Sequence, residues 1–161
     1  MKKLILLAVM ALVVLACGVP KTVIQSKKVM KGSWSLDTIN YDQPGKYNIS
    51  LLDDGSSDCF EGSTWRFIPN NNSGVYTIKN NDCLTGDRNF IFTIAEIDQA
   101  TSLYDFLLKP TVKQGSANKA EKTGYRLRLS QLGESSMQWQ QTVMVDNKPF
   151  TFNMNFTKIE E

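Results

Sequence analysis

The chain has 161 residues, with 18 lysines and arginines against 16 aspartates and glutamates, and it contains no histidine. This length is typical of one domain with a sizeable core. The missing histidine excludes serine–histidine and cysteine–histidine catalysis and histidine-based zinc sites, and the near balance of charges does not indicate nucleic-acid binding.

The first segment, residues 1–16, has the layout of a secretory signal. Lys2 and Lys3 are followed by an uncharged apolar run from residue 4 to residue 16. As a helix this run would be about 20 Å long, which is too short for a comfortable membrane span. A basic start, an apolar centre and a small residue at the end are typical of a leader that is removed on export. Without it, 16 basic residues face 16 acidic ones.

Cys17 follows this run in the sequence VLAC, which resembles the signal of bacterial lipoproteins. The resemblance implies that residues 14–16 are recognised, that the sulfur of Cys17 carries a diacylglycerol, and that the leader is cut just before it. Acyl chains hold a protein on a membrane at roughly 0.8 kcal/mol per buried methylene. An ordinary buried N-terminal helix with a chance cysteine is the alternative.

The resemblance also implies a cellular address and a domain boundary. Gly18 is not the aspartate that retains lipoproteins at an inner membrane, and residues 18–31 lack an acidic export cluster. We therefore expect the periplasmic face of the outer membrane. Residues 17–31 are expected to form the lipidated cysteine and a flexible tether, which is either attracted to anionic headgroups or simply solvated. Residues 32–161 are expected to form a single monomeric domain, because no repeat or second composition regime is found.

From residue 32 onward, short segments of alternating apolar and polar residues are separated by clusters of Asp, Asn, Gly, Ser and Pro. The nine segments are residues 32–39, 46–52, 63–69, 74–80, 89–97, 103–109, 123–132, 136–145 and 148–156. Alternation is clearest over residues 125–130 and 150–157, and no window shows a sustained helical period. The pattern predicts an antiparallel all-β meander, sandwich or barrel, with one dry and one wet face.

The first of these segments carries Gly32-Ser33-Trp34, which resembles the Gly-x-Trp signature of lipocalins. Residues 58–78, "DCFEGSTWRFIPNNNSGVYTI", look like those of bacterial lipocalin-like lipoproteins, and the likeness spans about residues 31–158. The resemblance implies a single antiparallel up-and-down β-barrel of eight to nine strands, closed and with room for a ligand. Gly32 and Trp34 would be its structural signature, with Trp34 a plug at the closed end and Arg126 or Arg128 packed over the indole.

Cys59 and Cys83 are the two remaining cysteines, an even pair in an oxidising compartment. They lie 24 positions apart and flank the hairpin expected over residues 63–80. We predict a disulfide that stabilises the domain by roughly 3 kcal/mol. The alternative is two separate thiols, one of them reactive, because some lipocalin-class isomerases use a free thiol.

No other feature predicts catalysis, a metal or a cofactor. Acidic residues gather at Asp53, Asp54, Asp58 and Glu61. They lack the regular ligand spacing of a calcium loop and its closing glutamate, so we predict a solvated turn. No glycine-rich phosphate cradle follows any strand. We expect no catalytic residues and a protein that is not an enzyme.

The aromatic residues at inward positions carry the functional hypothesis. In a barrel open at one end they would line an apolar pocket suited to a fatty acyl chain or another lipophile. The residues expected to line it are Trp65, Phe67, Tyr76, Phe92, Tyr125, Trp139 and Phe152. The prediction is a membrane-anchored lipoprotein that binds or carries a small hydrophobic ligand in the cell envelope. The alternatives are a barrel filled by its own side chains that acts as a structural or protein-interaction module and, third, a thiol-dependent enzyme.

Overall fold

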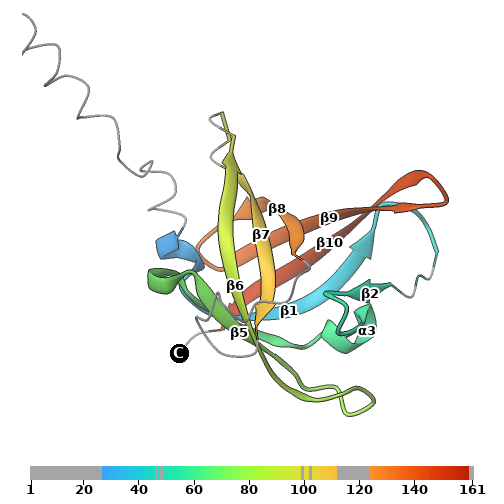
Figure 1. The fold of residues 1–161 in the computed structure, drawn as a ribbon, viewed down its shortest axis with the longest axis horizontal. Coiled ribbons are helices and arrows are strands. Elements are labelled where there is room, and N and C mark those ends of the chain that lie inside the picture. Colours follow the sequence, from blue (N-terminus) through green and yellow to red (C-terminus); the bar gives the residue numbers. More distant parts are fainter. Residues whose placement is uncertain are drawn as a thin grey trace, which may run out of the picture.

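The computed structural model describes residues 27–159 except residues 46, 48, 99, 102 and 112–123. The expected leader, Cys17 and residues 18–26 of the expected tether lie outside the described residues. The elements, shown in Figure 1, are β1 (Gly32–Tyr41), β2 (Ser50–Leu51), β3 (Gly55–Ser56), α3 (Ser57–Phe60), β4 (Thr64–Ile68), the 3-10 turn η2 (Pro69–Asn71), β5 (Ser73–Ile78), β6 (Gly86–Ile97), β7 (Tyr104–Thr111), β8 (Tyr125–Leu132), β9 (Ser136–Val145) and β10 (Lys148–Ile159). Within the described part of the chain, no helix has the length and hydropathy that a membrane span requires.

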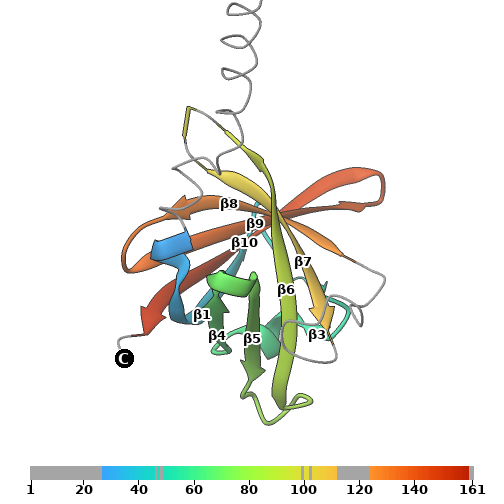
Figure 2. The same cartoon turned by 60° about the vertical axis from the view of Figure 1, so that its left-hand side comes forward.

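Eight of these strands close into one antiparallel barrel, in the order β1-β10-β9-β8-β7-β6-β5-β4. The strands from β4 to β10 follow one another as an up-and-down meander, and β1 completes the barrel by pairing with both β10 and β4. The two views in Figures 1 and 2 show the tilted strands around a common interior. The expected single antiparallel up-and-down barrel of eight to nine strands is confirmed, with eight strands in its wall.

Strand direction gives the barrel two distinct ends. We call the end where β1, β5, β7 and β9 finish the mouth, and the end where they begin the base. Alternation places every second side chain inside the barrel. In β8, Leu127 and Leu129 are buried while Arg126 and Arg128 are exposed. The apolar residues of the other strands follow the same period, so one hydrophobic core fills the space between base and mouth.

The segment expected as a ninth strand, residues 46–52, is not part of the barrel wall. Only Ser50–Leu51 of β2 pair, with Gly55–Ser56 of β3, and α3 follows directly. Leu52 and Asp53 adopt φ values of 54° and 52°, a left-handed turn that ends the strand after two residues. Residues 49–60, which we call the lid, therefore fold across one side of the mouth. The lid buries its own side chains Leu51, Leu52 and Phe60 in the hydrophobic core.

The base is covered by a helical turn over residues 27–30, which precedes β1. Met30 is 1% exposed. Its carbonyl oxygen accepts a hydrogen bond of 2.9 Å from the indole Nε1 of Trp34, and its sulfur accepts one of 2.8 Å from the hydroxyl of Tyr104. Trp34 is fully buried at this position. The turn thus packs on the barrel and begins the folded domain earlier than the expected boundary at residue 32.

The cation over Trp34 is Lys158, and the expected placement of Arg126 or Arg128 there is wrong. The Nζ atom of Lys158 lies 5.4 Å from the centroid of the Trp34 ring. Lys158 is the direct partner of Trp34 across the β1–β10 ladder. The two arginines alternate with inward-facing leucines of β8 and therefore point outward.

The predicted disulfide between Cys59 and Cys83 is present, with 5.8 Å between the Cα atoms. Cys59 belongs to α3 in the lid, and Cys83 lies in the connection from β5 to β6. Beside the bridge, the amide nitrogen of Asn80 donates a hydrogen bond of 3.2 Å to the carbonyl oxygen of Asp58. The lid is thereby fastened to the neighbouring loop at the mouth.

Replacing both cysteines, Cys59→Ser and Cys83→Ser, is expected to lower the free energy of unfolding by about 3 kcal/mol. The bridge closes a loop between residues 24 positions apart, and loop closure in the unfolded chain accounts for an effect of this size. Urea unfolding of the full chain measures it, with the reduced wild type as the control. Stoichiometric alkylation of both cysteines in the unfolded, unreduced wild type would contradict the bridge.

Candidate ligand-binding site

Six of the seven residues predicted to line a ligand pocket are deeply buried in the barrel. Their exposed fractions are 2% or less, and they are Trp65, Phe67, Tyr76, Phe92, Trp139 and Phe152. The seventh, Tyr125, is half-buried at the start of β8. All seven inward assignments agree with the alternation of their strands. Burial, however, leaves open whether they face a ligand or one another.

Three of these rings, those of Trp65, Phe67 and Trp139, contact one another between β4 and β9 across the barrel interior. The ring of Trp65 stacks on that of Tyr76 at a centroid distance of 4.6 Å and meets that of Trp139 edge-on at 5.3 Å. The ring of Phe67 lies 5.5 Å from that of Trp139 and 5.9 Å from that of Phe92. Side chains from opposite walls therefore meet in the middle of the barrel. A ligand chain at this depth would have to displace a ring.

Nearer the mouth, the interior opens into a depression of about 300 Å³. Its lining residues are Leu52, Asp53, Asp54, Tyr76, Arg88, Pro110 and Tyr125. We call it the mouth pocket. Tyr76 and Tyr125 are the two predicted residues that it brings together, and Trp65, stacked beneath Tyr76, connects the pocket with the ring core. The other predicted residues lie outside its lining.

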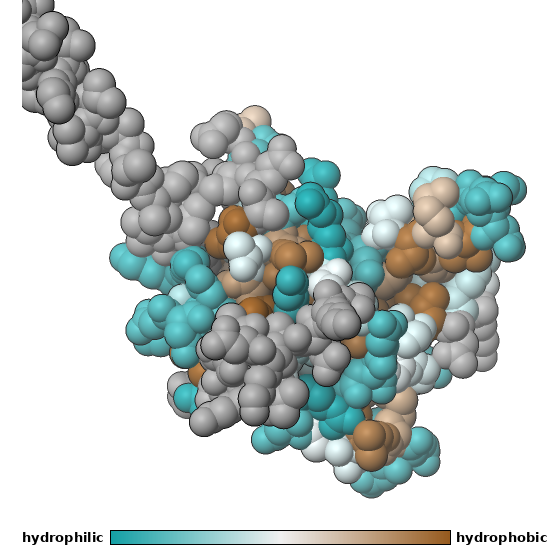
Figure 3. Space-filling model, viewed as in Figure 1, coloured by the Kyte–Doolittle hydropathy of each residue, from teal (hydrophilic) through white to brown (hydrophobic). Residues whose placement is uncertain are grey.

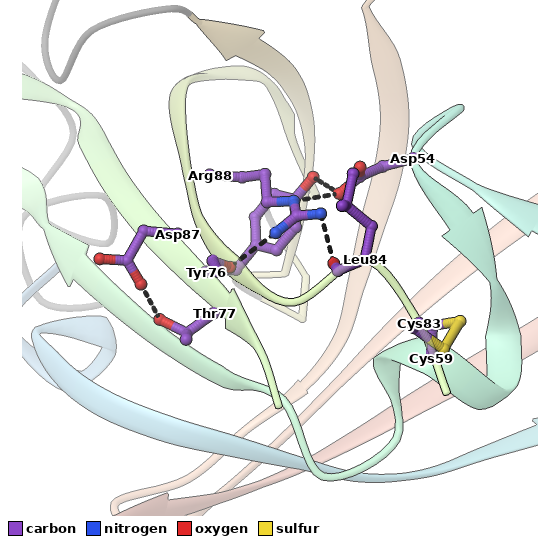
Figure 4. A network of polar contacts seen from close by, with 9 residues as sticks. Asp54, Cys59, Tyr76, Thr77, Cys83, Leu84, Asp87 and Arg88 are labelled. Atoms are coloured by element: carbon purple, nitrogen blue, oxygen red, sulfur yellow. Dashed lines mark hydrogen bonds and ion pairs between the residues drawn. A yellow bond between two sulfur atoms is a disulfide. The ribbon is translucent and has the colours of Figure 1, made fainter. Parts of the chain in front are cut away.

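A polar network stands on one side of the mouth pocket (Figure 4). One carboxylate oxygen of Asp54 accepts hydrogen bonds of 2.8 Å from both the Tyr76 hydroxyl and the Nε atom of Arg88. The remaining guanidinium nitrogens of Arg88 donate to the carbonyl oxygens of Gly86, at 2.8 Å, and Leu84, at 2.6 Å. The charges of Asp54 and Arg88 neutralise each other. Because Asp54 belongs to the lid, the same network holds the lid against β5 and β6.

The network favours the neutral form of the Tyr76 phenol. Burial raises the pKa of Tyr76 above its ordinary value of 10.0, and the hydrogen bond to the carboxylate of Asp54 raises it further. The hydroxyl therefore stays protonated at physiological pH and serves as a hydrogen-bond donor.

Five pocket residues were not predicted to line it: Leu52, Arg88 and Pro110, and also Asp53 and Asp54, which the sequence analysis assigned only to a solvated turn. Leu52 comes from the segment expected to be a wall strand, and its position depends on the left-handed turn of the lid. Arg88 did carry a signal: it shares the inward face of β6 with Phe90 and Phe92. A charged residue at an inward position indicates a buried partner, because an unpaired charge is costly there.

The four acidic residues at positions 53, 54, 58 and 61 have separate surroundings. No group of three or more metal-ligating side chains occurs among the described residues. The carboxylate of Asp54 accepts hydrogen bonds from Tyr76 and Arg88, and a carboxylate oxygen of Glu61 accepts a hydrogen bond of 2.7 Å from the backbone nitrogen of Ile39. Asp53 and Asp58 are exposed. Asp54 and Glu61 therefore attach this turn to the barrel.

Comparisons with known proteins give little beyond this geometry. No family model matches the sequence, and no curated protein matches it. Among solved structures, a lipocalin-like protein from Bacteroides uniformis ATCC 8492 is similar, at 12% identity and a TM-score of 0.45. The match covers 81% of this chain and 99% of that one.

Proposed function

We propose that this chain is a lipid-anchored protein of the cell envelope that binds a small hydrophobic ligand at the mouth pocket. The observation that carries the proposal is an opening of about 300 Å³ at one end of a closed barrel, walled by Leu52, Tyr76, Pro110 and Tyr125. Ligand sites in proteins are typically concave and mostly apolar, with a few fixed polar groups. The mouth pocket combines these four apolar or aromatic residues with three charged ones, Asp53, Asp54 and Arg88, of which the last two form an ion pair.

The dimensions of the pocket favour a small ligand or one end of a longer one. Its volume lies at the lower limit of the roughly 300–1,000 Å³ typical of ligand pockets, and the ring core closes its floor. The ion pair of Asp54 and Arg88 is internally neutral, and the exposed Asp53 adds one negative charge to the lining, so an uncharged lipophile fits better than an anionic one. Affinity would come from apolar area removed from water, at about 25 cal/mol per Å², and would change little with salt concentration.

The position of the first described residues, 27–30, supports an anchored orientation. The helical turn over residues 27–30 lies at the base, whereas the pocket lies at the mouth. A lipid on Cys17 would therefore attach the barrel by the end opposite its pocket, through a segment of ten residues that spans up to roughly 35 Å when extended. In this orientation the pocket opens to the aqueous compartment at the periplasmic face of the outer membrane.

Photolabelling tests the ligand proposal in the presence of detergent. The full chain is purified in detergent and irradiated with a diazirine derivative of decanol, with and without excess decanol, and labelled peptides are identified by mass spectrometry. We expect labelling that excess decanol removes, in peptides containing Leu52, Pro110 or Tyr125. Tyr125→Ala should reduce the specific labelling about fivefold or more, because the ligand loses the apolar contact area that the Tyr125 ring provides. Leu132→Ala, at the other end of β8, is the matched control. Labelling that is unaffected by excess decanol would contradict the proposal.

A filled barrel acting as a structural or protein-interaction module is the second candidate. The contacts between rings of opposite walls favour it, as does the projecting β9–β10 hairpin (Figure 1). Apolar surface gathers around this hairpin in Figure 3, where Met144 is 66% and Val145 46% exposed. The photolabelling experiment separates the two candidates. The third hypothesis, a thiol enzyme, loses its support from the cysteines of the domain, because Cys59 and Cys83 are joined.

A further inference from the structure

The outer surface of β10 and β9 and most of that of β1 is formed by neutral hydrogen-bonding side chains, with Asp37 at the β1 bulge as a charged exception, and we call it the polar face. Its residues are Ser33, Ser35, Thr38 and Asn40 of β1, Thr151, Asn153, Asn155 and Thr157 of β10, and Ser136, Gln138, Gln140 and Thr142 of β9. In residues 136–142 and 151–157, every outward position is Ser, Thr, Asn or Gln. Exposed protein surfaces are ordinarily about a quarter or more Lys, Arg, Glu and Asp, so this composition is unusual.

Strand register aligns these side chains in rows that run across the strands. Thr38, Asn155 and Gln138 form one row, and Asn40, Asn153 and Gln140 form the next. Within the rows the side chains are joined by hydrogen bonds. The amide nitrogen of Gln138 donates to Asn155 at 2.9 Å, and that of Gln140 donates to Asn153 at 2.8 Å.

The hydrogen bonds extend beyond the paired amides. The hydroxyls of Thr142 and Thr151 lie 2.9 Å apart in the following row. The hydroxyl of Ser130 donates to the side-chain oxygen of Gln138 at 2.8 Å, which continues the first row onto β8. The side chains of the polar face are thus held in place before any ligand arrives, which reduces the entropy lost on binding.

A cleft of about 620 Å³ lies over the mouth-proximal rows of this face. Its lining residues are Asp42, Asp105, Arg126, Arg128, Gln140, Thr142, Thr151 and Asn153. Two arginines and two aspartates leave it with no net charge, and Arg126 approaches Asp105 at 3.5 Å. Among the described residues, the guanidinium of Arg128 has no ion-pair partner within 4.0 Å. The cleft therefore combines hydroxyls, amides, carboxylates and guanidinium groups around one concave surface.

We infer that this cleft binds carbohydrate, in the form of a short oligosaccharide. Each sugar hydroxyl both donates and accepts hydrogen bonds, and an amide side chain offers both functions in a fixed geometry. The amide nitrogen of Gln140 donates a hydrogen bond to the amide oxygen of Asn153. The Gln140 oxygen and the Asn153 nitrogen have no partner among the described residues and can bond a ligand. Carboxylates supply further acceptors and arginines further donors. An apolar ligand would leave these groups unpaired, which is costly, and a polyanion would meet no net positive charge.

Calorimetry of the full chain tests this inference, in a polyoxyethylene detergent that carries no sugar. The probes are four uncharged saccharides, maltohexaose, chitohexaose, β-1,4-mannohexaose and xylohexaose. At least one is expected to bind saturably with a Kd below about 1 mM. Gln140→Ala and Asn153→Ala should each weaken it about fivefold or more, since each removes a hydrogen-bonding group. Asn89→Ala, an amide on the outer surface of β6, is the matched control and should change the Kd by less than about twofold.

Further variants separate this site from the mouth pocket. Arg128→Gln changes an exposed side chain of the cleft and should also weaken saccharide binding. Because this variant is expected to fold, it tests the inference even if an amide variant does not fold. Tyr125→Ala, in the mouth pocket, should leave saccharide binding unchanged. If none of the four saccharides binds, or if the cleft variants bind as the wild type does, the inference is overturned and the proposed lipophile site is unaffected.

Discussion

Replacing Trp139 by alanine is expected to lower the free energy of unfolding by about 3–5 kcal/mol, the range for large aromatic side chains removed from a core. The side chain is 0% exposed. Its ring lies 4.5 Å from that of Phe156, 4.9 Å from that of Phe106, and within 5.5 Å of those of Trp65 and Phe67. Among the described residues its indole nitrogen has no hydrogen-bond partner, so the loss consists of packing and the cavity left behind.

Urea unfolding of the full chain, followed by circular dichroism, measures this effect. Met144→Ala on the same strand is the control, because Met144 is 66% exposed and an exposed substitution is expected to change stability by less than about 0.5 kcal/mol. A loss below about 1 kcal/mol for Trp139→Ala would mean that the barrel interior is loosely packed. The filled ring core would then be contradicted, and a cavity at the level of Trp139 would be supported.

Replacing Cys17 by serine is expected to release the protein from the membrane fraction or to leave its leader uncut. In the proposed lipoprotein the thiol of Cys17 carries the lipid, and a hydroxyl would not substitute for it. Two or three acyl chains, at roughly 0.8 kcal/mol per buried methylene, would account for the proposed anchoring of the wild type. Detergent partitioning and the intact mass of the protein expressed with its own leader measure the result.

The paired cysteines provide the control for this substitution. Cys59→Ser combined with Cys83→Ser removes the disulfide but leaves Cys17 and its leader intact, so this variant should remain with the membrane. A Cys17→Ser protein that stays membrane-bound with the wild-type mature mass would refute lipidation. The anchor, and with it the proposed address at the outer membrane, would then have to be abandoned.

The two proposed sites occupy different surfaces of one barrel. The mouth pocket is bounded by the lid and by inward residues such as Tyr76, whose hydroxyl is paired with the ion pair of Asp54 and Arg88. The cleft of the polar face lies outside the wall and offers donors and acceptors that have no partner among the described residues. An apolar ligand therefore suits the first and a polyhydroxylated ligand the second. Variants of Tyr125 and of Asn153 test the two independently.

Local sequence was sufficient to predict the strands of the barrel wall, whereas their closure into one barrel was predicted only by the resemblance to lipocalins. A polar–apolar alternation with a period of two residues assigns each side chain to one surface of a strand, and clusters of turn residues mark the strand ends. β9 matches the predicted segment of residues 136–145, and the disulfide joins the predicted cysteines. These features depend on neighbours within one strand or one hairpin, which are adjacent in the sequence.

Tertiary structure alone decided what the inward aromatic residues contact. Trp65 and Trp139 meet across the barrel axis although 74 positions separate them in the sequence, so alternation could place both rings inside without showing that they touch. The same holds for Lys158 over Trp34 and for the lid, whose left-handed turn brings Leu52 to the mouth. The rows of the polar face likewise cannot be recognised in the sequence, because its threonines, asparagines and glutamines are aligned only by the pairing of β1, β10 and β9. Such contacts arise from barrel closure and strand register, which are set by the packing of the whole core.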